Sequence, residues 1–144
     1  MNDRSKIADL IPHGGDMVLL QNIIDFSDDH VITSTLSHLD LKNPLRFQGR
    51  LTAFAGVEYG AQAMAVYGGL TGGNTAGYLS TLSNITFHVQ YLDDVQGALT
   101  VEADKTLSNG QVMAYDFRIK NEQGHLLVGG QGLIFLTNET KGQT

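Results

Sequence analysis

The spacing of apolar residues predicts one long helix among several strands. Residues 51–70 form the longest apolar stretch, and a helix drawn over them is apolar nearly all the way round, which is typical of a buried helix. After this stretch, apolar residues alternate with polar ones, as in half-buried strands. The predicted helices are Lys6–Leu10 and one within 51–70, ending at Gly68-Gly69 or in the loop 71–75. The predicted strands are Met17–Phe26, His30–Ser37, Tyr78–Tyr91, Leu99–Leu107, Val112–Lys120 and Leu126–Phe135.

The order of these elements favours an α+β fold of the hotdog kind. Asn109-Gly110 predicts a hairpin turn, and residues 38–50 look irregular because they contain breakers such as Pro44 and Gly49. An antiparallel sheet wrapped around one long buried helix is the direct way to cover that helix. Hotdog folds usually pair into double hotdogs, so we expect a dimer in which an edge strand is covered. We expect one domain over residues 1–144, with a frayed tail at 138–144.

Composition and charge narrow the class of protein. The chain carries a net charge of −6, which argues against nucleic-acid binding because that usually needs a basic face. It has no cysteine, and its histidines are scattered, so we expect no disulfide, metal site or other cofactor. No secretory signal is visible, which predicts a cytoplasmic protein. Glu58 and Gln62 argue against a membrane span over residues 51–70.

Glu58 is the only ionisable acid or base in the apolar stretch 51–70. A buried carboxylate is costly unless it is protonated, hydrogen-bonded or paired, so an acid kept in such a setting is a candidate for function. Gln62 follows four residues later, and this spacing places both side chains on one face of a helix. The structural alternative is a carboxylate and an amide that only satisfy hydrogen bonds within the fold.

Several stretches of the chain resemble dehydratases of fatty-acid-type synthesis. The segment with Ile11-Pro12-His13 and the Glu58–Gln62 pair resemble the β-hydroxyacyl-ACP dehydratases of the FabZ type. A closer resemblance is to the ApeP-type subunits of aryl polyene clusters. It is carried by Asn43-Pro-Leu-Arg46, by Gly49-Arg-Leu51 and by Gly56-Val-Glu-Tyr-Gly-Ala-Gln-Ala-Met-Ala65.

This resemblance implies an enzyme that dehydrates 3-hydroxyacyl thioesters, carried by an acyl carrier protein, to trans-2-enoyl thioesters in polyene or fatty-acid-type synthesis. The reaction needs a base for the C2 proton, an acid for the departing C3 hydroxyl and a donor for the thioester carbonyl. Glu58 would be the acid, and Gln62 would orient it. Backbone N–H groups near Gly56 would bind the carbonyl, although Gly56 can equally serve helix–sheet packing. The acyl chain would lie in a tunnel between the helix and the sheet, closed by a partner subunit.

The base is the part of the site that the sequence leaves open. In the FabZ type, the catalytic histidine precedes the helix, but here Arg50 stands at that place, where we expect it to bind substrate. His38, at the end of the second predicted strand, and His13 are the candidates, and a chain without a base is the alternative. The remaining histidines are expected to be solvated or to face the other side of the sheet: His30, His88 and His125.

Two other functions fit the same residues. Arg50 in place of the usual histidine favours a non-catalytic subunit that stabilises an active dehydratase partner. A hotdog thioesterase would share the fold and the helix carboxylate. The expected partners are an acyl carrier protein, for which Lys42, Arg46 and Arg50 could form a local basic patch, and a second hotdog subunit in a homodimer or heterodimer.

Overall fold

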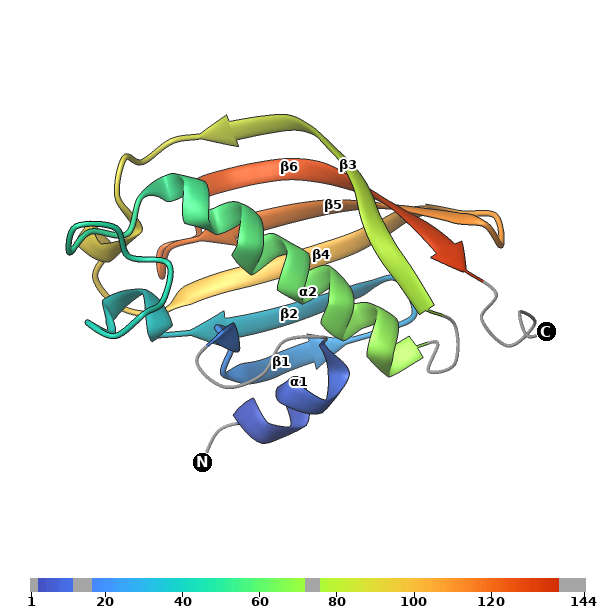
Figure 1. Cartoon of the computed structure of the whole chain (residues 1–144), viewed down its shortest axis with the longest axis horizontal. Coiled ribbons are helices and arrows are strands. Elements are labelled where there is room, and N and C mark those ends of the chain that lie inside the picture. The colour runs from blue at the N-terminus through green and yellow to red at the C-terminus, as the bar shows by residue number, and fades with distance from the viewer. Residues whose placement is uncertain (1–2, 12–16, 72–75, 138–144) are drawn as a thin grey trace.

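A computed structural model describes residues 3–11, 17–71 and 76–137 of the chain (Figure 1). Two helices and six strands make up most of it, with three short 3-10 turns between them. The helices are α1 (Arg4–Leu10) and α2 (Gly56–Thr71), and the 3-10 turns are η2 (Ser37–Leu39), η3 (Ala53–Ala55) and η4 (Leu92–Asp94). The strands are β1 (Asn22–Phe26), β2 (His30–Thr35), β3 (Ala76–Phe87), β4 (Leu99–Ser108), β5 (Val112–Lys120) and β6 (Leu126–Thr137).

The strands form one antiparallel sheet in the order β1-β2-β4-β5-β6-β3. The sheet curves, and α2 runs across its concave face, with α1 beside the β1 edge (Figure 1). The chain passes from β2 through α2 to β3 at the opposite edge, which is why the helix lies over the middle of the sheet. The predicted arrangement of an antiparallel sheet around one long helix is confirmed.

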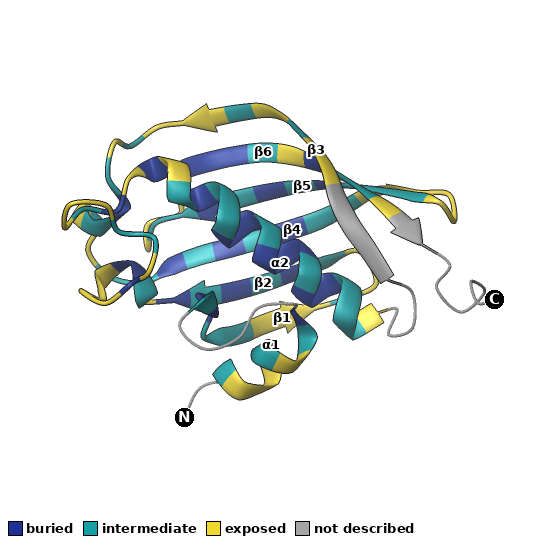
Figure 2. Ribbon diagram, in the orientation of Figure 1, coloured by how far each residue is buried: buried dark blue, intermediate teal, exposed yellow. Residues whose placement is uncertain are grey.

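Glycines let the helix lie very close to the sheet. A Cβ atom built on Gly60 would lie 2.3 Å from Cδ1 of Phe117, and one built on Gly130 would lie 2.9 Å from Cζ of the same ring. The Phe117 ring therefore fills the space between α2 and β6. In Figure 2, buried segments of α2 lie over buried segments of the strands, and partly buried residues alternate with them.

The first predicted strand is wrong over its first five residues, because β1 begins at Asn22 rather than at Met17. Residues 18–20 are buried, as a strand pattern suggests. The Leu19 N–H, however, donates to the Gln62 side chain, and the Leu19 carbonyl accepts from two hydroxyl groups. Because side chains use the N–H and carbonyl of Leu19, these groups are not available for hydrogen bonds to a neighbouring strand.

The other boundaries shift by smaller amounts. The strand predicted over 78–91 is β3 and ends at Phe87, and it has a bulge at Asn84, whose φ is 53°. The strand predicted over 30–37 ends at Thr35, where the η2 turn takes over. The predicted hairpin at Asn109-Gly110 is confirmed between β4 and β5, and Gly110 adopts the positive φ of 89° that such a turn needs. Residues 72–75 and the predicted tail, 138–144, lie outside the described residues.

Candidate functional site

Gln62 holds the Glu58 carboxylate in place on α2. The Gln62 side chain is almost fully buried, and its Nε2 donates to Glu58 Oε2 over 3.0 Å and to the Met17 carbonyl over 2.6 Å. Its Oε1 accepts the Leu19 N–H over 2.9 Å. All three bonds require the same orientation of the amide, so this orientation is fixed, and Glu58 receives a defined donor. The predicted pairing of these two side chains on one helical face is confirmed.

Glu58 lies on the face of α2 that points away from the sheet. The residues that pack on the sheet are fully buried, whereas Glu58 and its neighbours on the outer face are half-buried. These half-buried neighbours are small or apolar: Val57, Ala61 and Ala65. Within one chain, α2 is therefore buried on its sheet side and only partly covered on the other. The carboxylate projects from a small-residue face that the described part of this chain covers only in part.

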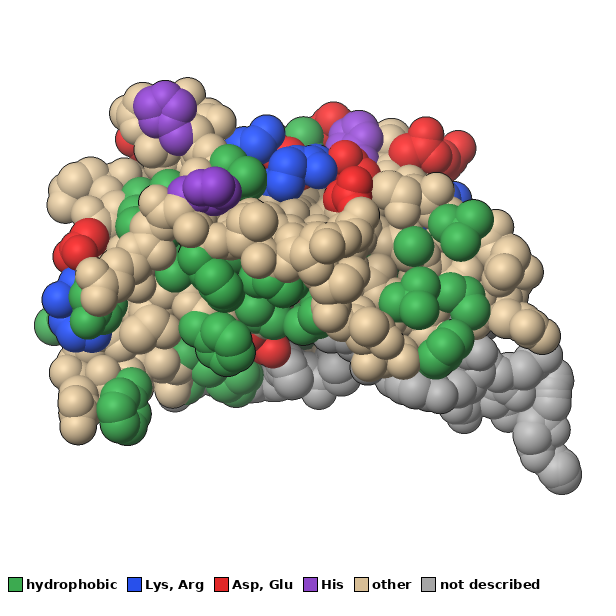
Figure 3. Space-filling view, turned by 90° about the horizontal axis from the view of Figure 1, so that it is seen from above, with side chains coloured by type: hydrophobic (Ala, Val, Ile, Leu, Met, Phe, Trp, Pro, Cys, Tyr) green, Lys and Arg blue, Asp and Glu red, His purple; other side chains and the backbone are tan. Residues whose placement is uncertain are grey.

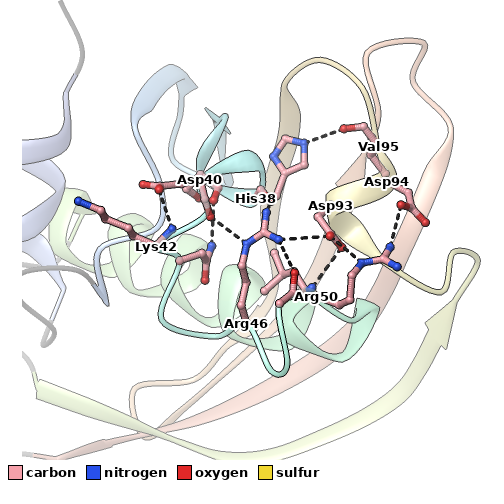
Figure 4. Close-up of polar contacts among 12 residues, drawn as sticks. His38, Asp40, Lys42, Arg46, Arg50, Asp93, Asp94 and Val95 are labelled. Carbon is pink, nitrogen blue, oxygen red and sulfur yellow. Dashed lines mark hydrogen bonds and ion pairs between the residues drawn. The ribbon is translucent and has the colours of Figure 1, made fainter.

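His38 lies in the η2 turn and is fully buried (Figure 4). Its Nε2 lies 3.1 Å from the Val95 carbonyl oxygen, which can only accept, so Nε2 carries the proton. Nδ1 is then the unprotonated nitrogen, and it is buried without a hydrogen-bond partner among the described residues. Burial is the main cause that lowers the pKa of His38, and the backbone hydrogen bonds oppose it. The ring is thus a neutral base whose Nε2 is directed toward the segment before β4.

The lowered pKa of His38 makes stability depend on pH. The unfolded chain takes up a proton on this ring near its ordinary pKa of about 6.5, but the folded chain resists it, so stability falls as the pH drops below that value. The free energy of unfolding of the wild type, relative to that of a His38→Gln variant, should therefore be constant at higher pH and decrease below about pH 6.5. Denaturant titrations from pH 8 to pH 5 measure this, and a flat difference would contradict it.

Arg50 is paired with acidic side chains (Figure 4). Its Nε donates to Asp93 Oδ2 over 2.9 Å, and its Nη2 donates to Asp94 Oδ1 over 2.7 Å. The guanidinium carbon also lies 3.8 Å from the centre of the Tyr91 ring, a cation–π distance. The expected roles for Arg50 in binding substrate or carrier protein compete with these contacts.

Arg46 is a structural clamp rather than part of a basic patch. Its side chain is 9% exposed, and it donates to the carbonyls of His38, Asp40 and Gly49 and to Asp93. The five fixed N–H groups of one guanidinium thereby hold the loop between η2 and η3. The predicted patch is wrong for Arg46, since a buried and paired charge cannot attract an acidic partner.

The Asp93 carboxylate accepts hydrogen bonds from Arg46, from Arg50 and from the backbone just before η3. Its Oδ1 also accepts the Leu51 N–H over 3.1 Å. Burial acts to raise the pKa of Asp93, but the hydrogen bonds from Arg50 and Leu51 outweigh it and hold the pKa below its ordinary value. A carboxylate of this kind stabilises the fold above its unfolded pKa and loses that effect as the pH falls.

The lowered pKa of Asp93 leads to a second prediction of how stability depends on pH. The stability difference between the wild type and an Asp93→Asn variant should be constant near neutral pH and shrink as the pH falls below about 3.9, the ordinary carboxyl value. Unfolding by urea between pH 7 and pH 2.5 measures it. Asp94→Asn is the matched control, because Asp94 is exposed and pairs with the same arginine. An equal pH dependence for both variants would refute the role given to Asp93.

The remaining predicted residues have simpler surroundings. A Cβ built on Gly56 would lie 2.9 Å from Ile119 Cδ1 and 3.0 Å from Val128 Cγ2, which shows its role in helix–sheet packing. His88 and His125 are exposed. His30 is less solvated than expected, because it lies 3.0 Å from Asp25 Oδ2 and 2.9 Å from Ser27 Oγ. His13 lies outside the described residues.

Apolar side chains are exposed along the loop before α2 and at the end of β3. Leu41, Phe47 and Phe54 are 84%, 71% and 72% exposed, and the Phe54 ring centre lies 6.2 Å from that of Phe87. Figure 3 shows hydrophobic side chains gathered in the middle of one face, with charged and histidine side chains along one margin. Exposed apolar surface of this extent commonly marks an interaction site.

The structure offers no metal-binding cluster and no membrane-spanning helix in the part of the chain that it describes. No three His, Cys, Asp or Glu side chains among residues 3–11, 17–71 and 76–137 come together as metal ligands. Within the same residues, no helix combines the length and the apolar character that crossing a membrane requires. Among the residues that the structure describes, the candidate catalytic groups include the Glu58–Gln62 pair and the neutral His38.

A curved antiparallel sheet around one long helix, with a carboxylate on that helix, defines a protein of the hotdog class. Residues 5–141 match the ApeP-like family, described as ApeP dehydratase, and the chain belongs to this family. Both the expected hotdog fold and the resemblance to the ApeP type are confirmed. Family and fold together support an activity of the dehydratase or thioesterase type.

Solved structures agree with this assignment. The dehydratase heterocomplex ApeI:P from Xenorhabdus doucetiae is 25% identical, with a TM-score of 0.78 over 93% of this chain and 92% of that chain. A thioesterase from Haemophilus influenzae is 14% identical, with a TM-score of 0.67 over 85% and 82% of the two chains. A hypothetical thioesterase with coenzyme A from Streptococcus pneumoniae is 17% identical, with a TM-score of 0.58 over 81% and 84%. These two thioesterases share the fold. Comparison with curated protein sequences found no match.

Proposed function

We propose that the chain takes part in the dehydration of 3-hydroxyacyl thioesters, carried by an acyl carrier protein, to trans-2-enoyl thioesters. The observation that carries the proposal is the Glu58 carboxylate, fixed by the buried amide of Gln62 on the outer face of α2. In this reaction the C2–H and C3–O bonds break, a C2–C3 double bond forms, and water leaves. Glu58 would give a proton to the departing hydroxyl, and a base would take the C2 proton.

The acyl chain would run along the outer face of α2 rather than between the helix and the sheet. The space under the helix is filled, because Gly56 and Gly60 bring its backbone onto Ile119 and Phe117. The outer face carries only short side chains beside Glu58. A second hotdog subunit placed over this face would enclose the chain and exclude water.

The base is proposed from two histidines. His38 has the required neutral form, and it can act only through Nδ1, because Nε2 donates to Val95. Its complete burial means that the loop around it, or a partner subunit, has to give substrate access to that nitrogen. His13 is the other candidate, proposed from its position in the Ile11-Pro12-His13 motif.

A second function is favoured by one observation, the engagement of Arg50. The guanidinium at the place of the FabZ-type histidine is held by Asp93 and Asp94, so this position supplies no base. A non-catalytic subunit that stabilises an active dehydratase partner would need no base of its own. The heterocomplex described for the Xenorhabdus relative and the exposed apolar surface near Phe47 and Phe54 support a heteromeric assembly.

One assay separates these functions. The isolated chain, and the chain mixed with a hotdog subunit encoded in the same genome, are given a 3-hydroxyacyl chain attached to acyl carrier protein. Enoyl product from the isolated chain supports the enzyme. Product only from the mixture, together with a partner that is unstable alone, supports the stabilising subunit. Release of free acid without enoyl product would contradict both and favour a thioesterase.

A further inference from the structure

A buried hydrogen-bond network connects Glu58 to the turn that carries His38. We infer that Tyr59 and Ser37 are positioning residues for the Glu58 carboxylate and act on it through Leu19 and Gln62. The inference rests on the proposed function for its catalytic meaning. The network itself is built from groups far apart in sequence.

The network begins at the Tyr59 hydroxyl, which is completely buried beneath α2. Asn43 Nδ2 donates to this oxygen over 3.0 Å, and Ser37 Oγ lies 2.8 Å from it. Burial raises the pKa of Tyr59, so the phenol keeps its proton at ordinary pH. Ser37 Oγ gives its one proton to the Leu19 carbonyl, so the phenol is the donor between the two hydroxyls.

Ser37 and Thr35 pass the network to the backbone of Leu19. Ser37 Oγ donates to the Leu19 carbonyl over 2.7 Å, and Thr35 Oγ1 donates to the same oxygen over 2.6 Å. Thr35 Oγ1 in turn accepts the Ser37 N–H over 3.0 Å. Each hydroxyl has one proton, and this assignment uses each proton once, so the carbonyl has two donors. Ser37 Oγ, 2.9 Å from Thr35 Oγ1, is a second acceptor for the Thr35 proton.

Leu19 and Gln62 complete the connection to the carboxylate. The Leu19 N–H donates to Gln62 Oε1 over 2.9 Å, and Gln62 Nε2 donates to Glu58 Oε2 over 3.0 Å. Along this path from Asn43, each group donates to the next one toward Glu58, and Gln62 Nε2 also donates to the Met17 carbonyl. The backbone of Leu19 links the two parts of the network: its carbonyl accepts from the Thr35 and Ser37 hydroxyls, and its N–H donates to the Gln62 amide.

The network fixes both halves of the proposed acid–base pair relative to one another. Ser37 is the first residue of η2, and His38 follows it directly. Tyr59 follows Glu58 on α2. Loss of the Tyr59 hydroxyl would remove one donor to Ser37 Oγ and let the Ser37 hydroxyl turn to other acceptors, so the Leu19 backbone would be held less firmly. A displacement of about 1 Å in a catalytic group can cost about a hundredfold in rate.

Amide hydrogen exchange and steady-state kinetics of a Tyr59→Phe variant test the inference. We expect the Leu19 amide to exchange at least about fivefold faster relative to amides of β4, which report global unfolding, because a buried hydrogen bond of this kind is worth roughly that factor. We expect kcat to fall by about tenfold or more with KM little changed, because positioning rather than binding is lost. The matched control is Tyr67→Phe, which removes a hydroxyl bonded to the Asp28 carbonyl from the same helix, outside the network.

The outcomes are separable from those of the proposed function. Unchanged Leu19 exchange in Tyr59→Phe, or the same acceleration in Tyr67→Phe, overturns the inference whether or not the protein is active. If no mixture dehydrates the substrate, the proposed function fails, and the Leu19 amide still decides whether the network holds Gln62. A Ser37→Ala variant should match Tyr59→Phe in both readouts, and the double variant should be no worse than Ser37→Ala alone. Additive losses would show that the two residues act independently.

Discussion

A Glu58→Gln substitution is expected to lower the rate of dehydration by at least about a hundredfold, the usual scale for losing a catalytic acid. Glutamine keeps the shape of the side chain, and its carbonyl oxygen can accept the same hydrogen bond from Gln62 Nε2. The fold should therefore be retained while the exchangeable proton is lost. Enoyl-thioester formation is measured in whichever preparation of the wild type is active, the isolated chain or the mixture with a hotdog partner.

Asp9→Asn provides the matched control for this experiment, because it removes an exposed carboxylate from α1, the other helix. Its rate should equal that of the wild type. Full activity of Glu58→Gln in the isolated chain would exclude Glu58 as the acid. Full activity only in the mixture would mean that the partner supplies the chemistry, as the stabilising-subunit hypothesis requires.

A Gly60→Ala substitution is expected to destabilise the fold by about 1–3 kcal/mol, although alanine is the better helix former. The new Cβ would lie 2.3 Å from Cδ1 of Phe117, well inside van der Waals contact. The ring cannot easily move away, because Gly130 brings β6 against its other end. Either the helix lifts from the sheet or the ring leaves its rotamer, and both cost energy. Denaturant unfolding of both proteins measures the difference.

Gly68→Ala is the control on the same helix, because nothing lies within 4 Å of a Cβ built there. It should be neutral or stabilise the protein by up to about 1 kcal/mol, since alanine restricts the unfolded chain and favours the helix. Gly60→Ala should destabilise a Phe117→Leu background less than it destabilises the wild type, because the clashing ring is gone. Equal changes in stability for the two alanines would show that contact with Phe117 does not determine the cost at Gly60.

Local patterns predicted the elements whose surroundings are regular. The alternation of residues in β2, β4 and β5 gave their positions to within about two residues, because one face of each meets the core. The apolar run at 17–20 has the same composition as a strand and was predicted wrongly. Its backbone bonds to Gln62 and to the hydroxyls near Thr35, and no local pattern reveals partners so distant in sequence.

The candidate site shows the same division. The spacing of Glu58 and Gln62 predicted their contact, because four residues make one turn of a helix. The face on which Glu58 lies could not be predicted, since α2 is rich in Ala and Gly and gives little contrast between its sides. The ion pair between Arg50 and Asp93 could not be predicted either, because the two residues lie 43 positions apart in the chain. Tyr59 was overlooked, although its place beside Glu58 in the Gly-x-Glu-Tyr string was visible.

The close contact of α2 with the sheet also limits how substrate range can diverge among related chains. Replacing Gly56 or Gly60 with a residue that has a side chain would disturb the packing of α2 on the sheet and would not reshape a substrate pocket. If the proposed function holds, variants that accept longer or shorter acyl chains should differ at Val57, Ala61 and Ala65, where side chains can change size without moving the helix. A partner subunit would form the opposite wall, so the preferred chain length would be a joint property of two sequences.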